Sequence, residues 1–302
     1  MRRPDRYPPV LAAADVLAPY LRTQAADFLR GLRLHRENSA PTDAGGRAAE
    51  EAADALRRAA RRISGTLHTF RDALDPVWAE ELRTELAWLS GTMAREHAYA
   101  ARLTRLLDAL HQLSDSAKEQ TVGTARAGAL LERQLTLART RAHSAALQAL
   151  GSSRFHAVAD AVALLASDVP LCPTAEPLHV SADHAEQRLL TAVAALPRET
   201  PDPYNETQDA LWHRTRLLLR LHRYAHEVVR GTPEPALRKA GRALDAHRDA
   251  AEAAAASASA ARTPRIAPAT AYTLGVLHAD QRHEVRTART AFREAWPYVS
   301  AP

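Results

Sequence analysis

The stretch HRTRLLLRLHRYAHEV, residues 213–228, decides how the rest of the chain is interpreted. Within it, His213, Arg216, Arg220 and Arg223 are separated by three, four and three positions. An α-helix turns by about 100° per residue, so these four side chains fall within roughly 80° of one helical face. Leucines occupy much of the remaining surface. The stretch therefore predicts an amphipathic helix that carries a basic stripe beside its apolar face.

The same spacing occurs a second time, in DALRRAARRISGTL at residues 54–67. Asp54, Arg57, Arg61 and Ser64 each lie 159 positions before their counterparts in the first stretch. A solvated helix face with chance charge spacing explains either stripe alone, although like charges one turn apart repel each other. Two copies in one register favour a ligand surface instead. A row of guanidinium groups suits a ligand with regularly spaced negative charges, such as a phosphate chain.

Helical periodicity extends from these two stretches over nearly the whole chain, with short Pro, Gly or Ser interruptions. Aromatic residues are only 5% and no long segment alternates with period two, so strands are not expected. Asp75 is expected to cap a helix that begins at Pro76. About ten helices are expected, at Pro9–Leu34, Arg47–Ala73, Pro76–Leu89, Met93–Leu113, Gln120–Leu150, Arg154–Ser167, Ala182–Leu196, Asn205–Arg230, Glu234–Ala261 and Pro268–Trp296.

Three breaks organise these helices. Asn38–Gly46 is expected to be a loop, Val169–Leu178 a proline-rich linker, and Pro197–Pro203 a second break near the middle. The middle breaks divide the chain into comparable helical halves, at about 9–150 and 151–296. Long helices joined by short loops pack as antiparallel bundles.

The composition does not identify a binding partner, but it does indicate the cellular compartment. The net charge is +5, and because only two residues are lysine, 38 of the 40 basic residues are arginine. A GC-rich coding bias explains most of this excess. The single cysteine, Cys172, excludes an intrachain disulfide and a cysteine-based zinc site, and a lone thiol fits a reducing compartment. No segment has the pattern of a membrane span or a secretory leader, so a cytoplasmic protein is expected.

Catalytic and metal chemistry find little support in the sequence. His222 and His226 have a spacing that can hold a metal, but no acidic third ligand is evident nearby. Asp54 and Asp209 lack an adjacent nucleophile or acid, which a general base would need. There is no glycine-rich phosphate loop. We therefore expect no catalytic residue, no metal and no cofactor.

The pattern His-x-x-Arg-x-x-x-Arg-x-x-Arg-Tyr resembles the second repeat motif of the CHAD family (conserved histidine α-helical domain). Arg57-x-x-x-Arg61-Arg62 resembles the first repeat motif. Four further stretches resemble the family in the expected order, at Leu74–Gly91, Ala149–Phe155, Ala243–Ala250 and Thr273–Trp296. The resemblance covers about Leu11 to Trp296, and it predicts one CHAD-like domain over residues 9–296.

This resemblance implies an all-α fold of two pseudo-symmetric antiparallel four-helix bundles, whose long inner helices line a shared basic groove. It further implies non-enzymatic binding of inorganic polyphosphate, and with it an association with polyphosphate granules. The alternating-glutamate strand of the triphosphate-tunnel enzymes, to which some members are fused, is missing, so a stand-alone member is expected. The implied polyphosphate-binding residues are Arg57, Arg61, Arg62, His213, Arg216, Arg220 and Arg223, with Arg58 and Tyr224 as additional candidates.

The first repeat departs from the family pattern. Asp54 stands where a histidine is expected, and Ser64 stands where a basic residue is expected. Asp54 would repel a polyanion unless it orients a neighbouring arginine, so the second repeat is expected to contribute more to binding. His213, with a pKa near its ordinary value, would donate to phosphate when protonated.

Two alternatives remain open. Nucleic acid also presents a ladder of phosphates, but the stripes lack interleaved aromatic residues for base stacking, and the net charge is mild. A scaffold protein with a decayed binding repeat would account for Asp54 and Ser64. Tyr224 and the neighbouring Trp212 are interpreted mainly as packing residues. The sequence leaves the oligomeric state open.

Overall fold

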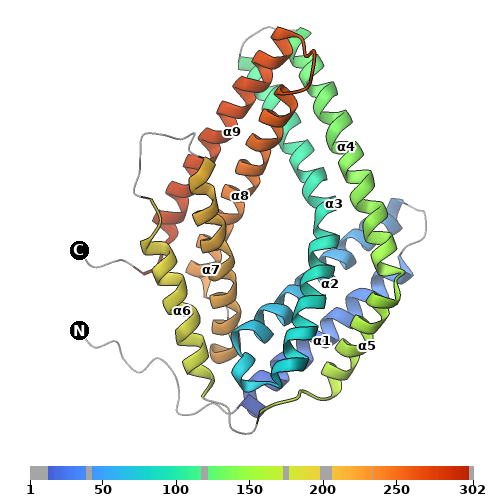
Figure 1. Ribbon diagram of the computed structural model, residues 1–302, viewed down its shortest axis with the longest axis vertical. Helices are drawn as coiled ribbons and strands as arrows, with labels where there is room; N and C mark the ends of the chain where they lie inside the picture. Colours follow the sequence, from blue (N-terminus) through green and yellow to red (C-terminus); the bar gives the residue numbers. More distant parts are fainter. Residues whose placement is uncertain are drawn as a thin grey trace. The chain divides into compact units, whose positions relative to one another are not determined.

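The protein is helical throughout the part of the chain that the computed structural model describes, which is residues 13–38, 43–116, 122–172, 177–197, 206–232 and 234–298. Nine α-helices and two short 3-10 helices form this part, and its one β-bridge joins Leu74 to Leu171. The all-α prediction is confirmed. The helices are α1 (Ala13–Glu37), α2 (Asp43–Thr69), α3 (Pro76–Ser116), α4 (Val122–Leu150), α5 (Ser153–Ser167), α6 (Leu178–Ala194), α7 (Asp209–Arg230), α8 (Pro235–Ala261) and α9 (Pro268–Ala295), with η1 (Arg71–Ala73) and η2 (Glu206–Gln208) (Figure 1).

One expected break is absent, because α3 runs without interruption through Ser90 and Gly91 for 41 residues. The Ser90 hydroxyl donates to the carbonyl of Ala87 at 3.3 Å, within the helix. Leu86 and Leu89 are fully buried just before it. Their packing outweighs the cost of about 1 kcal/mol that a glycine imposes on a helix interior. The prediction of two helices here was therefore wrong.

Several helix ends also differ from the sequence prediction. Helix α2 already begins at Asp43, so the loop expected at Asn38–Gly46 is shorter, and its residues 39–42 lie outside the described residues. The same helix ends at Thr69 rather than Ala73, because the chain tightens into η1. The expected cap is confirmed, since the Asp75 carboxylate accepts from the backbone N–H of Trp78 at 2.9 Å. The expected helical residues 9–12, 120–121 and 205, and most of the break at 197–203, also lie outside the described residues.

The chain forms two compact units, each built from three segments. Unit 1 comprises residues 1–94, 144–191 and 218–234, and unit 2 comprises residues 95–143, 192–217 and 235–302. Helices α3, α4 and α7 each begin in one unit and end in the other. Both units thus draw on both sequence halves, and the domain limits of 9 and 296 stay a prediction. The two units are described separately below.

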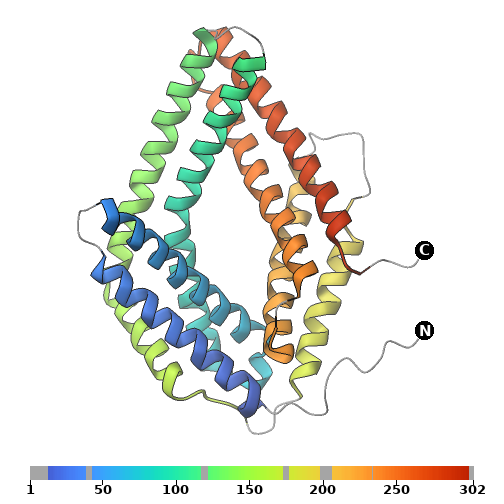
Figure 2. The ribbon, with the colours of Figure 1, turned by 180° about the vertical axis from the view of Figure 1, so that it is seen from behind.

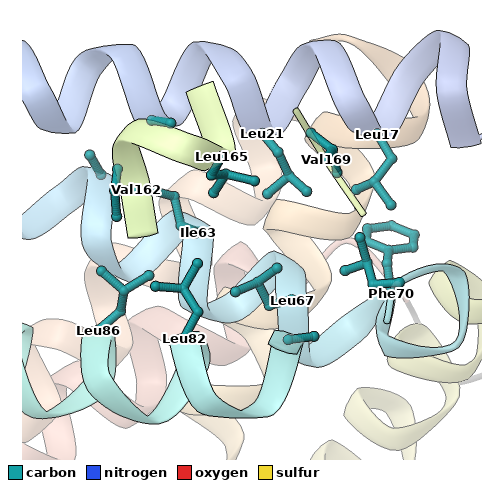
Figure 3. Packing of buried hydrophobic residues seen from close by; sticks show 14 of the residues in the cluster. Leu17, Leu21, Ile63, Leu67, Phe70, Leu82, Leu86, Val162, Leu165 and Val169 are labelled. Carbon is teal, nitrogen blue, oxygen red and sulfur yellow. The ribbon is translucent and has the colours of Figure 1, made fainter. Parts of the chain in front are cut away.

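The core of unit 1 fixes the orientation of α2. Helix α1 packs against α2 and α5 (Figure 2). Buried residues recur at three- and four-residue spacing along α2, at Leu56, Ala60, Ile63 and Leu67, and Phe70 continues the series just after the helix. Figure 3 shows Ile63, Leu67 and Phe70 between labelled leucines of α1 and α3, with Val162 and Leu165 of α5 in the same cluster. Burial of each such leucine or phenylalanine contributes about 1.5–3 kcal/mol, which strongly favours this rotation of the helix.

Unit 2 has its own core. Helices α8 and α9 pack against each other as an antiparallel pair (Figures 1 and 2). Leu274 and Leu277 of α9 are fully buried, together with Ala253 and Ala260 of α8. Leucines of α3 and α4 complete this cluster. Among the described helices of both units, none is apolar enough over a sufficient length to cross a membrane.

Candidate functional site

The basic stripe of α2 lies beside the core-facing side of that helix. Leu56, Ala60 and Ile63 are buried, while Arg57 and Arg61 stand one position further along and are half-buried. Arg57 donates to the Asp54 carboxylate at 2.7 Å, and its side chain is only 12% exposed. Asp54 thus holds the neighbouring arginine, which is one of the two roles considered for it. Arg58 is exposed.

Helices α2 and α7 touch closely within unit 1 at Gly65 and Tyr224. A Cβ atom on Gly65 would lie 2.7 Å from the Cδ2 atom of the Tyr224 ring, so only glycine allows this approach. Gly65 and Tyr224 are themselves 159 positions apart and occupy equivalent places in the repeat. Contact between equivalent positions is what a two-fold relation between two helices produces. The two copies of the sequence repeat therefore also meet in space at this crossing.

Within unit 1, the crossing lies near the end of the α2 stripe and near the part of the α7 stripe that follows residue 217. Arg61 and Ser64 lie within about one helical turn of Gly65, and Arg220 and Arg223 lie within about one turn of Tyr224. Arg61, Arg220 and Arg223 are all half-buried. Three half-buried arginines thus lie on the two helices within about one turn of their crossing. Such a concentration of like charge favours an anionic ligand.

Arg62, also expected to bind phosphate, has a carboxylate partner. Its Nε and Nη2 atoms donate to the two oxygens of Glu227 at 3.1 and 3.2 Å. The Tyr20 hydroxyl donates to the same carboxylate at 3.4 Å. Burial and the negative charge of Glu227 raise the pKa of Tyr20, so this phenol stays protonated. Sequence reasoning missed Glu227, because Arg62 and Glu227 are 165 positions apart and no local spacing indicates that they meet.

The stripe of α7 continues into unit 2 through His213 and Arg216. The Nε atom of Arg216 donates to the Asp245 carboxylate of α8 at 2.5 Å, and the arginine side chain is 18% exposed. His213 is exposed at one edge, while its ring packs edge-on against His247, with centroids 5.5 Å apart. Partial burial lowers the pKa of His213 below its ordinary value, and Asp209 and Glu252 counteract this only in part. The expectation of an ordinary pKa was wrong, and His213 is mostly neutral at pH 7.

A buried cluster around Asp209 fixes the beginning of α7. The Asp209 carboxylate accepts from Arg282 at 2.6 Å and from Arg289 at 2.5 Å, and it lies 3.5 Å from the His247 ring nitrogen. Burial alone would raise a carboxyl pKa, but the contacts with His247 and Arg282 outweigh it and hold the pKa of Asp209 well below its ordinary value. A carboxylate held in this way is a poor general base. Sequence reasoning missed both arginines, although they lie in the stretch Thr273–Trp296 that resembles the family.

The remaining candidates take structural positions. Trp212 is 1% exposed and stacks on His247 with centroids 5.4 Å apart, and Tyr224 is 7% exposed. Their interpretation as packing residues is confirmed. His222 is buried, and the Nε2 atom of His226 lies 3.6 Å from the Glu234 carboxylate. In the described part of the chain, no three metal-ligating side chains are grouped to hold an ion.

Comparisons with known proteins agree with this arrangement. The family model described as "CHAD domain" matches residues 30–236. The structure is similar to that of PptA from Streptomyces chartreusis, at 62% sequence identity and a TM-score of 0.84, over 94% of this chain and 99% of that one. It also shares the fold of the CHAD domain from the plant Ricinus communis, at 20% identity and a TM-score of 0.57, over 97% of both chains. The comparison with curated proteins gave no match. The repeated motif, its spatial meeting at Gly65 and Tyr224, and the family-model match over most of its length thus lead to one conclusion: this chain belongs to the CHAD domain family.

Proposed function

We propose that this protein is a non-enzymatic binding module for inorganic polyphosphate. The observation that carries the proposal is the crossing of α2 and α7, where Arg61, Arg220 and Arg223 collect within about one helical turn of Gly65 and Tyr224. Arg57 adds its charge on α2, and His213 and Arg216 extend the same face of α7 toward its beginning. Guanidinium groups donate paired hydrogen bonds to phosphate oxygens and remain charged at every physiological pH.

Arg61, Arg220 and Arg223 are proposed as the principal phosphate ligands because they lie within about one helical turn of the crossing. Arg57 and Arg216 each have a carboxylate partner, which orients them and partly neutralises them. Arg62 is proposed to act mainly by adding positive charge, because its donors already engage Glu227. Arg58 is exposed on the flank of α2, so it supplies a longer-range attraction.

Nucleic acid is a weaker candidate on the same surface. Tyr224 borders the stripe of α7, and its ring is buried against Gly65 and Arg62. It is therefore withdrawn from base stacking, which single-stranded nucleic acid would use. Catalysis is not proposed, because Asp54 and Asp209 are both engaged by arginines.

The test is a binding titration with long-chain polyphosphate at low salt. Arg61→Glu and Arg220→Glu should each weaken binding by about tenfold or more, the effect expected for reversing a charge-assisted contact. Arg214→Glu is the matched control. It lies on the same helix and is exposed, but its side chain is turned about 140° from the stripe centre. Equal losses in Arg214→Glu and Arg220→Glu would refute the stripe as the binding surface. Stronger binding of RNA than of polyphosphate, at equal phosphate concentration, would favour a nucleic-acid module.

A further inference from the structure

The basic stripe of α2 does not end at Ser64. His68 lies four residues later and falls within the same helical arc. Just beyond it α2 ends, and the chain turns through η1 into α3. At this turn, within unit 1, there is a cavity of about 460 Å³ lined by His68, Arg71, Asp72, Glu80 and Arg83. We call it the His68 cavity.

Positive charge surrounds the His68 ring from three elements. Arg71 belongs to η1, Arg83 to α3 and Arg188 to α6. Partial burial, and then the charges of Arg188, Arg83 and Arg71, lower the pKa of His68, while Glu80 acts in the opposite sense. The Ser64 hydroxyl donates to the backbone carbonyl of Arg83 at 3.1 Å, which ties this part of α3 to the stripe itself. The cavity therefore adjoins the end of the stripe, and its charged lining consists of two arginines and two carboxylates.

Carboxylates already occupy two of these arginines. Glu80 accepts from Arg83 with both oxygens, one of them at 2.7 Å from Nε, and Asp72 lies 3.4 Å from the Nε atom of Arg71. The Glu80 and Asp72 side chains are 63% and 66% exposed, so solvent screens these ion pairs and weakens them. A ligand with more negative charge can displace them. The arginines are thus placed to bind acidic oxygens that are not part of the protein.

We propose that the His68 cavity binds the terminal phosphate group of a polyphosphate chain whose inner units lie along the stripe of α2. This inference rests on the proposed function and adds a subsite to it. The end of such a chain differs from its interior, because a terminal phosphate has a second ionisation with a pKa near about 6, as in a phosphate monoester. The end group therefore carries more charge than an inner unit. Arg71 and Arg83, which line the cavity where the helix ends, match that difference.

The experiment compares two long polyphosphates of equal length, one with free ends and one with both ends blocked as phosphoramidates, which removes charge from the ends alone. The unmodified protein should bind the free-ended chain about threefold or more tightly than the blocked one, and Arg71→Glu should abolish this preference. Arg30→Glu is the matched control in unit 1. Arg30 is 67% exposed and pairs with a neighbouring aspartate, as the 71% exposed Arg71 does. This control should keep the preference.

A second measurement does not depend on the long chain. The protein is labelled with ¹⁵N-histidine, and the NMR signal of His68 is identified as the one that is missing in His68→Gln. Added tripolyphosphate should raise the pKa of His68, because a bound anion stabilises the imidazolium. An unchanged His68 pKa, or a preference for free ends that survives in Arg71→Glu, would overturn the His68 cavity as an end-group site. If long-chain polyphosphate still bound through Arg61 and Arg220, the proposed function would stand without it. If no polyphosphate bound at all, both proposals would fall.

Discussion

Asp209 is the residue on which the beginning of α7 depends. Its carboxylate contacts Arg282, Arg289 and His247, and the side chain of Arg282 is only 1% exposed. Since three elements meet at one carboxylate, its charge is needed to balance a buried arginine. A neutral replacement should therefore cost far more than the loss of a surface ion pair.

Asp209→Asn is expected to lower the free energy of unfolding at pH 7 by about 3–5 kcal/mol, because it leaves Arg282 buried and unpaired. The folded state depresses the pKa of Asp209, so its stabilisation is fully present above the unfolded-state pKa of about 4 and is lost as the pH falls below it. Urea unfolding at a series of pH values should thus show that the free energies of unfolding of the wild type and the variant converge at acidic pH. Asp27→Asn, at a 43% exposed carboxylate paired with exposed Arg30, should change little.

His213 should make polyphosphate binding sensitive to pH. Burial lowers the pKa of His213 in the free protein, and a bound phosphate would raise it again. Affinity should therefore rise as the pH falls through the bound-state pKa, by about three- to tenfold between pH 8 and pH 5.5. Titrations of His213→Gln should show a flatter dependence, whereas His184→Gln on the exposed face of α6 should follow the wild type. Parallel profiles for all three proteins would contradict a role for His213.

At the scale of the helices, local signals predicted some features and tertiary packing decided others. The capping of α3 by Asp75 and the stripe spacings depend on neighbours within four residues, so the sequence contains them. The break expected at Gly91 was wrong because burial of Leu86 and Leu89 overrides glycine propensity. Arg62 and Glu227 meet across 165 positions, and periodicity within either helix holds no information about the other.

Two glycines in helices should respond to alanine in opposite directions. A Cβ on Gly91 would have no heavy atom within 4 Å, so Gly91→Ala should stabilise the fold by about 0.5–1 kcal/mol through helix propensity. At Gly123, a Cβ would lie 2.7 Å from the backbone oxygen of Ala269, which cannot move cheaply because α9 begins there. Gly123→Ala should cost about 1–3 kcal/mol. Urea unfolding followed by far-UV circular dichroism gives the midpoint for each variant. A higher midpoint in Gly123→Ala as well as in Gly91→Ala would disprove the close approach of α4 and α9.

Considered as a whole, the molecule has a net charge of only +5, so its overall charge attracts a polyanion weakly. Binding must then depend on where the arginines are placed. Composition shows the excess of arginine, and the repeat shows its register, but only the meeting of Gly65 with Tyr224 shows that Arg61, Arg220 and Arg223 lie near one helix crossing in unit 1. The salt dependence of polyphosphate binding separates the effect of the net charge from that of the positions of the arginines.

The logarithm of the polyphosphate association constant should fall linearly with the logarithm of salt concentration, because bound arginines release counterions. With about four to six phosphate contacts, a slope of about −3 to −4 is expected, by analogy with single-stranded nucleic acid. Arg220→Glu and Arg214→Glu change the net charge equally, so an attraction governed by net charge would alter both slopes alike. Attraction by the stripe predicts a slope shallower by about one unit in Arg220→Glu and an unchanged slope in Arg214→Glu. Titrations at four or five salt concentrations distinguish these outcomes, because the two variants have the same net charge but carry the new charge on different faces of α7.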